Sequence, residues 1–248
     1  MYQKERIDKI MEILKENGYV TVKYLTDKLH YSNATVNRDL NIMASRKLIT
    51  RSYGGVELCE NISVPLEFRY HKAKIAKRSI AKFAAGFIAD GDTVFIDGTT
   101  TSEGMGDYIS QKKDVTVITN NMALAAHLSE YGIKVISTGG NVVEAPYMLG
   151  GDDAVRTVLK YNTDKMFFSA GGISSEGSIC SKTTIYNMIY FSALKNAREV
   201  YFLIDHSKVN LNLKYNIIDL SGVNAVISDY AFSAEMKEKF KNTRFYEV

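Results

Sequence analysis

Between residues 93 and 228, short apolar runs with the character of buried strands alternate with stretches of helical periodicity. The strand-like runs cover residues 93–97, 115–119, 134–137, 165–169, 200–205 and 223–228, and helical stretches between them include 122–132, 152–161 and 184–197. Parallel strands need a long crossover connection, which a helix provides, so this order favours a mostly parallel sheet. The sequence therefore predicts an α/β domain in the C-terminal two thirds of the chain.

Polar residues and glycines follow five of these strand-like runs. In an open parallel sheet the carboxyl ends of the strands share one edge, and ligands bind there. Hydroxyls, backbone N–H groups and a lysine suit phosphate oxygens, whereas carboxylates accept hydrogen bonds from sugar hydroxyls. Each motif alone fits an ordinary turn or a capped helix; their convergence predicts an anion site. The predicted effector-binding residues are Asp97, Gly98, Thr99, Thr100, Thr101, Asn120, Gly139, Gly140, Gly171, Gly172, Asp205 and Lys208.

Residues 1–58 predict three short helices followed by a β-hairpin. Apolar residues recur at helical spacing between residues 7 and 14, and Ser32 is suited to cap the third helix. Two strand-like runs, 48–51 and 56–58, flank the turn pair Gly54-Gly55. This succession is the plan of a winged helix-turn-helix domain.

The third helix of this segment has one apolar and one polar face. The polar face carries Asn37, Arg38 and Asn41, and it is thin enough to enter a major groove of about 12 Å. Arg38 can contact a guanine or a phosphate, either asparagine can pair with adenine, and Lys23 and Arg51 can contact phosphates. The pattern alone leaves open a small helical bundle that binds protein. The predicted DNA-binding residues are Lys23, Ser32, Ala34, Thr35, Asn37, Arg38, Asn41, Arg51 and Tyr53.

Charge is distributed unevenly along the chain of 248 residues, whose net charge is +3. Residues 1–82 hold 16 Lys and Arg against 9 Asp and Glu, whereas the remainder holds 15 against 19. A basic N-terminal third suits a polyanionic partner, although uneven surface charge would give the same count. The expected organisation is a DNA-binding domain at 1–58, a linker at 59–70 and a sensing domain at 71–248.

Two cysteines without CxxC spacing suggest neither a disulfide framework nor a zinc site, and we expect no metal or cofactor. The chain begins with a charged amphipathic segment that lacks the apolar centre of a signal peptide. No apolar run approaches the roughly 18 residues of a membrane span. We therefore expect a cytoplasmic protein with no membrane partner.

The N-terminal segment resembles the DNA-binding domain of the DeoR family of bacterial transcription regulators. The resemblance rests on Glu5-Arg6, on the run 35–40, and on Arg51 with Gly54-Gly55. The family usually has a second arginine where this chain has Asn37, and a histidine where it has Tyr53. The linker also looks like that of the family, which implies that the helix after it transmits the state of the second domain.

The C-terminal segments "VFIDGTTTS", "VITNN", "STGG", "DKMFFSAGGISSEG" and "LIDHSK" look like the DeoR sensor domain. That domain is similar in fold to ribose-5-phosphate isomerase and glucosamine-6-phosphate deaminase, and the family typically senses phosphorylated sugars. The family turn usually reads Asp-x-Gly-Thr-Thr, and here Thr99 stands at the glycine position.

These observations predict a transcription regulator, most simply a repressor of a carbohydrate-metabolism operon. Its expected partners are double-stranded operator DNA and a phosphorylated sugar or sugar alcohol that changes operator affinity. A palindromic operator requires at least a dimer, so we expect a homodimer or homotetramer. Two alternatives stay open: a sugar-phosphate isomerase or deaminase that carries a DNA-binding domain, and a constitutive DNA-binding protein with a vestigial sensor.

Overall fold

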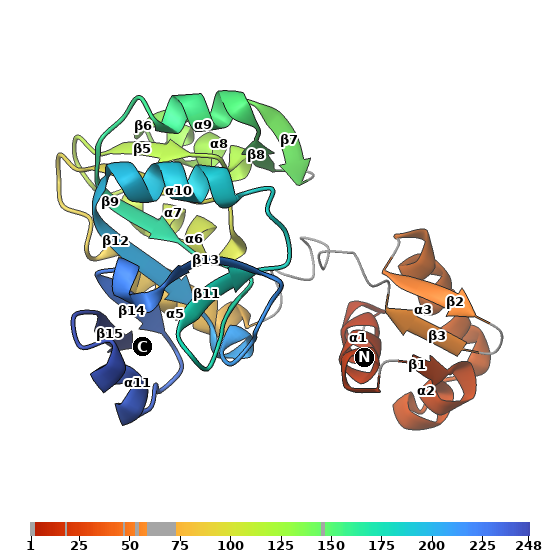
Figure 1. Ribbon diagram of the computed structural model, residues 1–248. Helices are drawn as coiled ribbons and strands as arrows, with labels where there is room; N and C mark the ends of the chain where they lie inside the picture. Colours follow the sequence, from red (N-terminus) through yellow and green to blue (C-terminus); the bar gives the residue numbers. More distant parts are fainter. Residues whose placement is uncertain (1–2, 18, 47, 53–54, 59–72, 145–146) are drawn as a thin grey trace. The chain divides into compact units, whose positions relative to one another are not determined.

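The computed structural model divides into two compact units, residues 1–71 and 72–248, and each is described by itself (Figure 1). The structure describes residues 3–17, 19–46, 48–52, 55–58, 73–144 and 147–248. The expected linker at 59–70 lies outside these residues.

The N-terminal unit contains three helices and a small antiparallel sheet, as a winged helix-turn-helix requires. Its elements are α1 (Gln3–Asn17), β1 (Tyr19–Thr21), α2 (Val22–Leu29), α3 (Asn33–Ser45), β2 (Ile49–Ser52) and β3 (Gly55–Leu58). Both predicted strands are present, and β3 lies between β2 and a third strand, β1, which the sequence analysis missed. The core is a single cluster in which Ile10, Leu14, Leu25, Leu40 and Met43 are fully buried.

An ion pair inside this unit fixes α3 against α1. Arg6 Nε donates to Asp39 Oδ2 at 2.8 Å, and Arg6 Nη2 donates to Asp39 Oδ1 at 3.1 Å. The Asp39 side chain is only 1% exposed, and it also accepts from Gln3 Nε2 at 3.1 Å. The Arg6 guanidinium lies 5.0 Å from the ring centre of Tyr31, two residues before α3. The hydrogen bond to the Asp39 carboxylate raises the pKa of Arg6 above its usual value.

The second unit is built on a seven-stranded sheet whose paired strands are all parallel. The strand order is β15-β14-β12-β9-β4-β5-β6. Its strands are β4 (Thr93–Ile96), β5 (Thr116–Thr119), β6 (Lys134–Ser137), β9 (Thr163–Phe168), β12 (Ala197–Ile204), β14 (Ala225–Ser228) and β15 (Arg244–Glu247). The first six match the six predicted strand-like runs; the edge strand β15 was not predicted.

Helices and short antiparallel pieces complete this unit. The helices are α5 (Lys74–Ala85), α6 (Thr100–Glu103), α7 (Gly106–Ile109), α8 (Met122–Glu130), α9 (Asp152–Val158), α10 (Asn187–Asn196) and α11 (Ala234–Lys239), with short 3-10 turns η1 (His206–Lys208) and η2 (Leu220–Gly222). The remaining strands are β7 (Asn141–Glu144), β8 (Met148–Gly150), β10 (Gly172–Ile173), β11 (Ser178–Ser181) and β13 (Tyr215–Asp219). None of the helices in the described part of the chain has the length and apolar character that a bilayer span needs.

Two apolar clusters cover the two faces of the sheet, and neighbouring residues of each strand contribute to them in turn. Phe95 and Phe202 pack with α9 and α10 on one face, whereas Ile96 and Leu203 pack with α5 and α8 on the other. Alternation follows from the period of two in a strand, and burial on both faces explains the nearly continuous apolar runs. Figure 1 shows α9 and α10 together on one side of the sheet. The unit is therefore a three-layer α/β domain.

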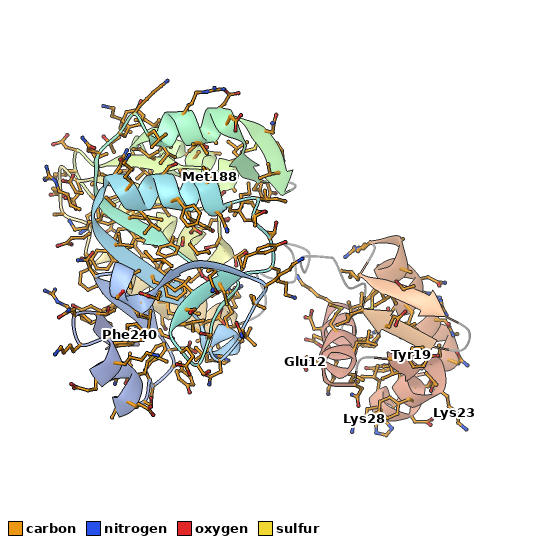
Figure 2. The ribbon with its side chains drawn as sticks, viewed as in Figure 1. Glu12, Tyr19, Lys23, Lys28, Met188 and Phe240 are labelled. Atoms are coloured by element: carbon orange, nitrogen blue, oxygen red, sulfur yellow. The ribbon has the colours of Figure 1, made fainter. Side chains whose placement is uncertain are left out.

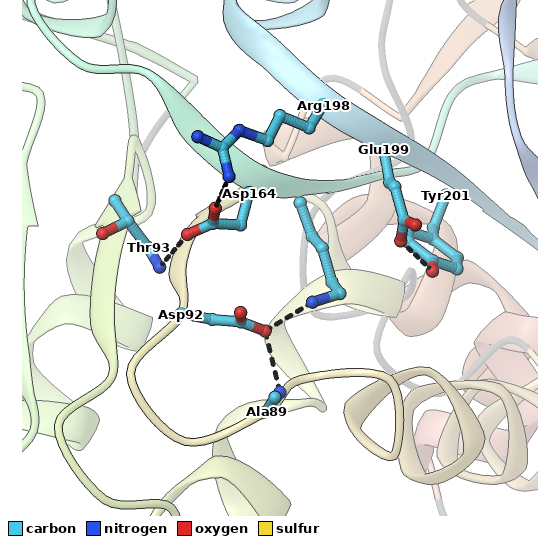
Figure 3. Close-up of polar contacts among 8 residues, drawn as sticks. Ala89, Asp92, Thr93, Asp164, Arg198, Glu199 and Tyr201 are labelled. Carbon is cyan, nitrogen blue, oxygen red and sulfur yellow. Dashed lines mark hydrogen bonds and ion pairs between the residues drawn. The ribbon is translucent and has the colours of Figure 1, made fainter.

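The amino-terminal ends of the central strands are joined to one another by internal pairs (Figure 3). Lys165 Nζ donates to Asp92 Oδ2 at 2.6 Å. The Asp164 carboxylate accepts from the Thr93 N–H at 2.9 Å and from Arg198 Nη1 at 3.1 Å. Because these charged side chains are paired with one another, we interpret this edge of the sheet as structural.

Replacing Arg6 by leucine is expected to destabilise the N-terminal unit by about 3 kcal/mol, because a buried carboxylate loses its charged partner. Urea unfolding followed by circular dichroism measures this. The matched control is Arg156→Leu, which breaks the exposed pair of Arg156 with Asp153 and should change stability little. Equal effects of the two substitutions would contradict a structural role for the Arg6–Asp39 pair.

Candidate functional site

The predicted DNA-binding residues lie on α2, α3 and β2 of the N-terminal unit. Ser32 caps α3 by accepting from the Thr35 N–H at 3.2 Å, as its sequence position predicted. Lys23 is exposed on α2, where Figure 2 shows it pointing away from the unit. Ala34, Arg38 and Asn41 are exposed on the face of α3 opposite its buried residues. Tyr53 lies outside the described residues, and direct DNA contacts by the others stay a prediction.

Arg51 reaches from β2 to the polar face of α3. Arg51 Nη2 donates to Asn37 Oδ1 at 2.6 Å, and Nη1 donates to Asn41 Oδ1. Asn37 Nδ2 in turn donates to the carbonyl oxygen of Asn33 at 2.9 Å. The wing strand and the third helix therefore present one joined polar surface.

In the second unit, the strand order reverses between β4 and β9. From β4 the chain proceeds to β5 and β6 on one side, then returns to β9 on the other side of β4. Such a switch point opens a crevice at the carboxyl ends of the strands, where ligands of α/β proteins bind. The polar residues that follow β4, β5, β9 and β12 meet at this edge.

Asp97, directly after β4, bridges this switch point. Its Oδ2 accepts from the Ser169 N–H after β9 at 3.3 Å and from the Tyr190 hydroxyl of α10 at 3.0 Å. Its Oδ1 accepts from the Thr99 hydroxyl at 3.0 Å. Burial raises the pKa of Asp97, and hydrogen bonds, including one from Ser102, oppose that rise. The carboxyl group is engaged by protein donors, which makes it an organiser of the turn; direct ligand contact stays a prediction.

The turn 98–101 has ordinary geometry at Thr99. Thr99 has φ −80° and ψ 154°, an extended conformation that needs no glycine, and its hydroxyl accepts from the Ser102 N–H at the start of α6. Gly98 is the residue that needs its lack of a side chain, since a Cβ there would lie 2.7 Å from Met148 of β8. The departure from the family turn is therefore accommodated by a capping threonine.

Three buried polar atoms at this edge have no hydrogen-bond partner among the described residues. They are Thr101 Oγ1, Asn120 Oδ1 and Asp205 Oδ2, and their residues are at most 2% exposed. Asn120 Nδ2 donates to the Leu149 carbonyl at 3.1 Å, which fixes the amide. Its Oδ1 lies 3.4 Å from where a Gly98 Cβ would stand. Unpaired buried polar atoms are costly, so each requires a partner such as an ordered water or a ligand group.

Two lysines add positive charge to the same edge. Lys208 reaches from the end of β12 to that of β9, where Nζ donates to the Ala170 carbonyl at 3.0 Å and lies 3.5 Å from Ser169 Oγ. Lys77 of α5 is only 7% exposed, and its Nζ donates to Thr100 Oγ1 at 3.0 Å.

Lys77 is missing from our predicted effector site, although the sequence contains a signal for it. It precedes Ile80, Ala81 and Ala84 at spacings of three, four and seven, so it falls on the apolar, buried stripe of its helix.

The predicted glycines shape the loops around the site. A Cβ at Gly172 would lie 2.8 Å from Leu211, and one at Gly171 would lie 2.7 Å from Leu213, so both allow the loop after η1 to pack closely. Gly139 and Gly140 have positive φ angles in the turn from β6 to β7. Gly140 lies against Gly150 and Ala154. No ligand contact of these glycines follows from this geometry.

Two family models cover most of the chain. The DeoR-like helix-turn-helix domain matches residues 6–61, and the DeoR C-terminal sensor domain matches residues 72–230. The chain belongs to the DeoR family. It is accordingly a DNA-binding transcription regulator.

Other DeoR-family proteins match along nearly the whole chain. The glycerol-3-phosphate regulon repressor of Escherichia coli (strain K12) is 29% identical over 231 residues, 92% of each chain. The HTH-type transcriptional regulator IolR of Bacillus subtilis (strain 168) is 33% identical over 205 residues, 82% of each chain. The lactose phosphotransferase system repressor of Staphylococcus aureus (strain NCTC 8325 / PS 47) is 30% identical over 254 residues, covering 99% and 98%.

Among solved structures, ribose 5-phosphate isomerase A from Methanocaldococcus jannaschii overlaps with 55% of each chain at 17% identity and a TM-score of 0.41. The parallel strand order and the two covered faces of the sheet establish the α/β fold of this DeoR sensor domain independently.

Tyr190→Phe should lower the free energy of unfolding of this sensor domain by about 1–3 kcal/mol, because the buried Asp97 carboxyl group loses a donor. Urea unfolding at pH 7 measures the change. Tyr131→Phe is the matched control, since Tyr131 is 58% exposed. An unchanged stability of the Tyr190 variant would show that the Asp97 cluster contributes little to the fold.

Proposed function

We propose that this DeoR-family protein represses a carbohydrate-metabolism operon and that a phosphorylated sugar or sugar alcohol changes its affinity for operator DNA. The curated relatives named above include repressors of a glycerol-3-phosphate regulon and of a lactose phosphotransferase system. Their names support a phosphorylated carbohydrate as the class of signal. The protein has a state with high DNA affinity and a state with low DNA affinity. An effector that binds the second state more tightly weakens operator binding, and its difference in affinity for the two states limits how much.

The observation that carries this proposal is the mixture of donors and acceptors at the carboxyl edge of the sheet. The ammonium groups of Lys77 and Lys208 and the hydroxyl of Thr101 suit a phosphate. Asp205 Oδ2 and Asn120 Oδ1 are acceptors, and they suit the hydroxyl groups of a polyol. A phosphorylated sugar carries both kinds of group on one molecule.

Self-assembly is part of the proposal because one third helix reads one half-site of a palindromic operator. Exposed apolar side chains in and just before α10 support it: Ile185, Met188 and Phe191 are 51%, 60% and 43% exposed, and Figure 2 shows Met188 on α10. An operator-bound homodimer is the simplest assembly, and a homotetramer is a pair of such dimers. A cytoplasmic location follows from the proposed action on DNA.

The alternative is a sugar-phosphate isomerase or deaminase, whose candidate bases are Asp97, Glu176, Asp205 and His206. Asp205 keeps Oδ2 without a partner among the described residues, whereas the other three favour a regulator. Asp97 is engaged by protein donors. Glu176 is exposed and pairs with Lys239 at 2.8 Å, and His206 is exposed and pairs with Asp229. Purified protein should therefore not turn over ribose 5-phosphate or glucosamine 6-phosphate in a coupled assay. Turnover of either compound at an enzymatic rate would overturn the assignment as a regulator alone.

A thermal-shift screen should identify the effector class. Ribose 5-phosphate, glucosamine 6-phosphate and glycerol 3-phosphate form the panel, with free ribose and inorganic phosphate as controls. At a hundredfold excess over Kd, a ligand of the native state adds about 2.7 kcal/mol of stability, which raises the Tm by several degrees. An unchanged Tm across the panel, together with operator binding that ignores every compound, would favour the constitutive DNA-binding protein.

Lys208→Ala and Lys77→Met should each weaken binding of the compound that shifts the Tm by about tenfold or more, because each removes a charged donor. Operator binding without effector should stay unchanged. Lys160→Ala, an exposed lysine in the same unit, is the control. If the effector still changes operator binding by both lysine variants as it does for the wild type, the proposed site is wrong.

A further inference from the structure

Without DNA, Arg51 is already hydrogen-bonded to two asparagines of α3. The oxygen atoms of both Asn37 and Asn41 accept from the Arg51 guanidinium, at 2.6 Å in the case of Asn37. Arg51 is exposed and belongs to β2, whose register places it opposite Val56 of β3. Its guanidinium therefore lies over the polar face of α3, although its backbone belongs to the wing.

On this polar surface, the groups that remain available to contact DNA are hydrogen-bond donors. A guanidinium carries five N–H donors, and Arg51 uses two of them on the asparagines. Asn41 is exposed, and only its Oδ1 is engaged by Arg51, so its Nδ2 keeps donor capacity. Asn37 Nδ2 is occupied by Asn33. The exposed Arg38 beside them adds donors as well.

This arrangement disfavours the adenine contact that the asparagines alone would suggest. An asparagine reads adenine by accepting from N6 and donating to N7. Here the accepting oxygens already face a guanidinium, whose positive charge repels the partly positive amino group of adenine. Guanine instead presents two acceptors, O6 and N7, to the major groove.

We propose that Arg51 reads a guanine in the operator half-site together with Asn41, as a base-reading residue carried by the wing strand and oriented by α3. The inference rests on the proposed function, since it requires sequence-specific binding of a DNA duplex. It assigns to Arg51 a role that differs from the phosphate contact expected from the sequence.

Selection of binding sites from a random duplex library by the purified full-length protein tests this. The wild type should enrich guanine at one defined position of each half-site. Arg51→Ala should reduce the preference for guanine over adenine at that position by about tenfold or more and leave the other positions unchanged. Arg51→Lys should not restore the preference, because a lysine cannot form the same bidentate fork.

Lys23→Ala is the matched control, because a phosphate contact carries no sequence information. This variant should bind all sequences more weakly and keep the wild-type base preferences. If Arg51→Ala behaves in the same way, and Arg51→Lys restores affinity, Arg51 is a phosphate contact and the inference is wrong. Circular dichroism verifies that the exposed substitutions leave the fold intact.

The same selection experiment distinguishes failure of the proposed function from failure of this inference. A wild-type protein that enriches no sequence would overturn the proposed regulator and this inference with it. A wild-type motif whose guanine preference survives Arg51→Ala would overturn this inference alone.

Discussion

The buried carboxyl group of Asp97 determines how the carboxyl edge of the main sheet is built. It stands at the reversal of strand order and accepts hydrogen bonds from the Ser169 N–H, the Tyr190 hydroxyl and the Thr99 hydroxyl. A carboxyl group taken out of water is costly unless such donors surround it, so the segments that supply them are held in place. One interaction set thereby joins β4, the turn before α6, the end of β9 and α10. The groups that we propose to bind the effector belong to the segments joined by this cluster or lie next to them.

The charged groups of the two edges of the sheet differ in their internal pairing, although Thr163 Oγ1 at the amino edge also has no partner among the described residues. At the amino edge, Asp92 and Asp164 are matched by basic residues and backbone donors. At the carboxyl edge, Asp205 and Asn120 each keep an acceptor that no described residue satisfies, while Lys208 is held by the Ala170 carbonyl. This edge holds both buried acceptors and lysine ammonium groups, which is the combination that the proposed ligand, with its hydroxyls and an anionic group, requires. Charge content alone would not have separated the edges.

The sequence predicted the strands of the main sheet well, because burial on both faces gives continuous apolar runs. It did not predict β15, whose "RFYE" places two adjacent aromatic residues between two charged ones at an edge of the sheet, or the hairpin of β7 and β8 that fixes Asn120. These depend on pairing between distant segments, which leaves a weak local pattern. Lys77 was missed for the opposite reason, since its helical position was readable but its charge suggested solvent. The Arg51 contacts join residues ten and fourteen positions away, and no local pattern reports them.

The binding surfaces that we propose for the two units follow one physical rule. A polar side chain can offer a ligand only the hydrogen-bonding groups that its partners within the protein do not already use. Asp97 looks like a ligand group by residue type, yet protein donors occupy it, and so it orders its neighbours instead. Asn41 looks like an adenine reader by type, yet its oxygen faces Arg51, and so its outward character is that of a donor. Residue identity thus limits the chemistry of a site, and the hydrogen bonds made before binding select which part of that chemistry is used.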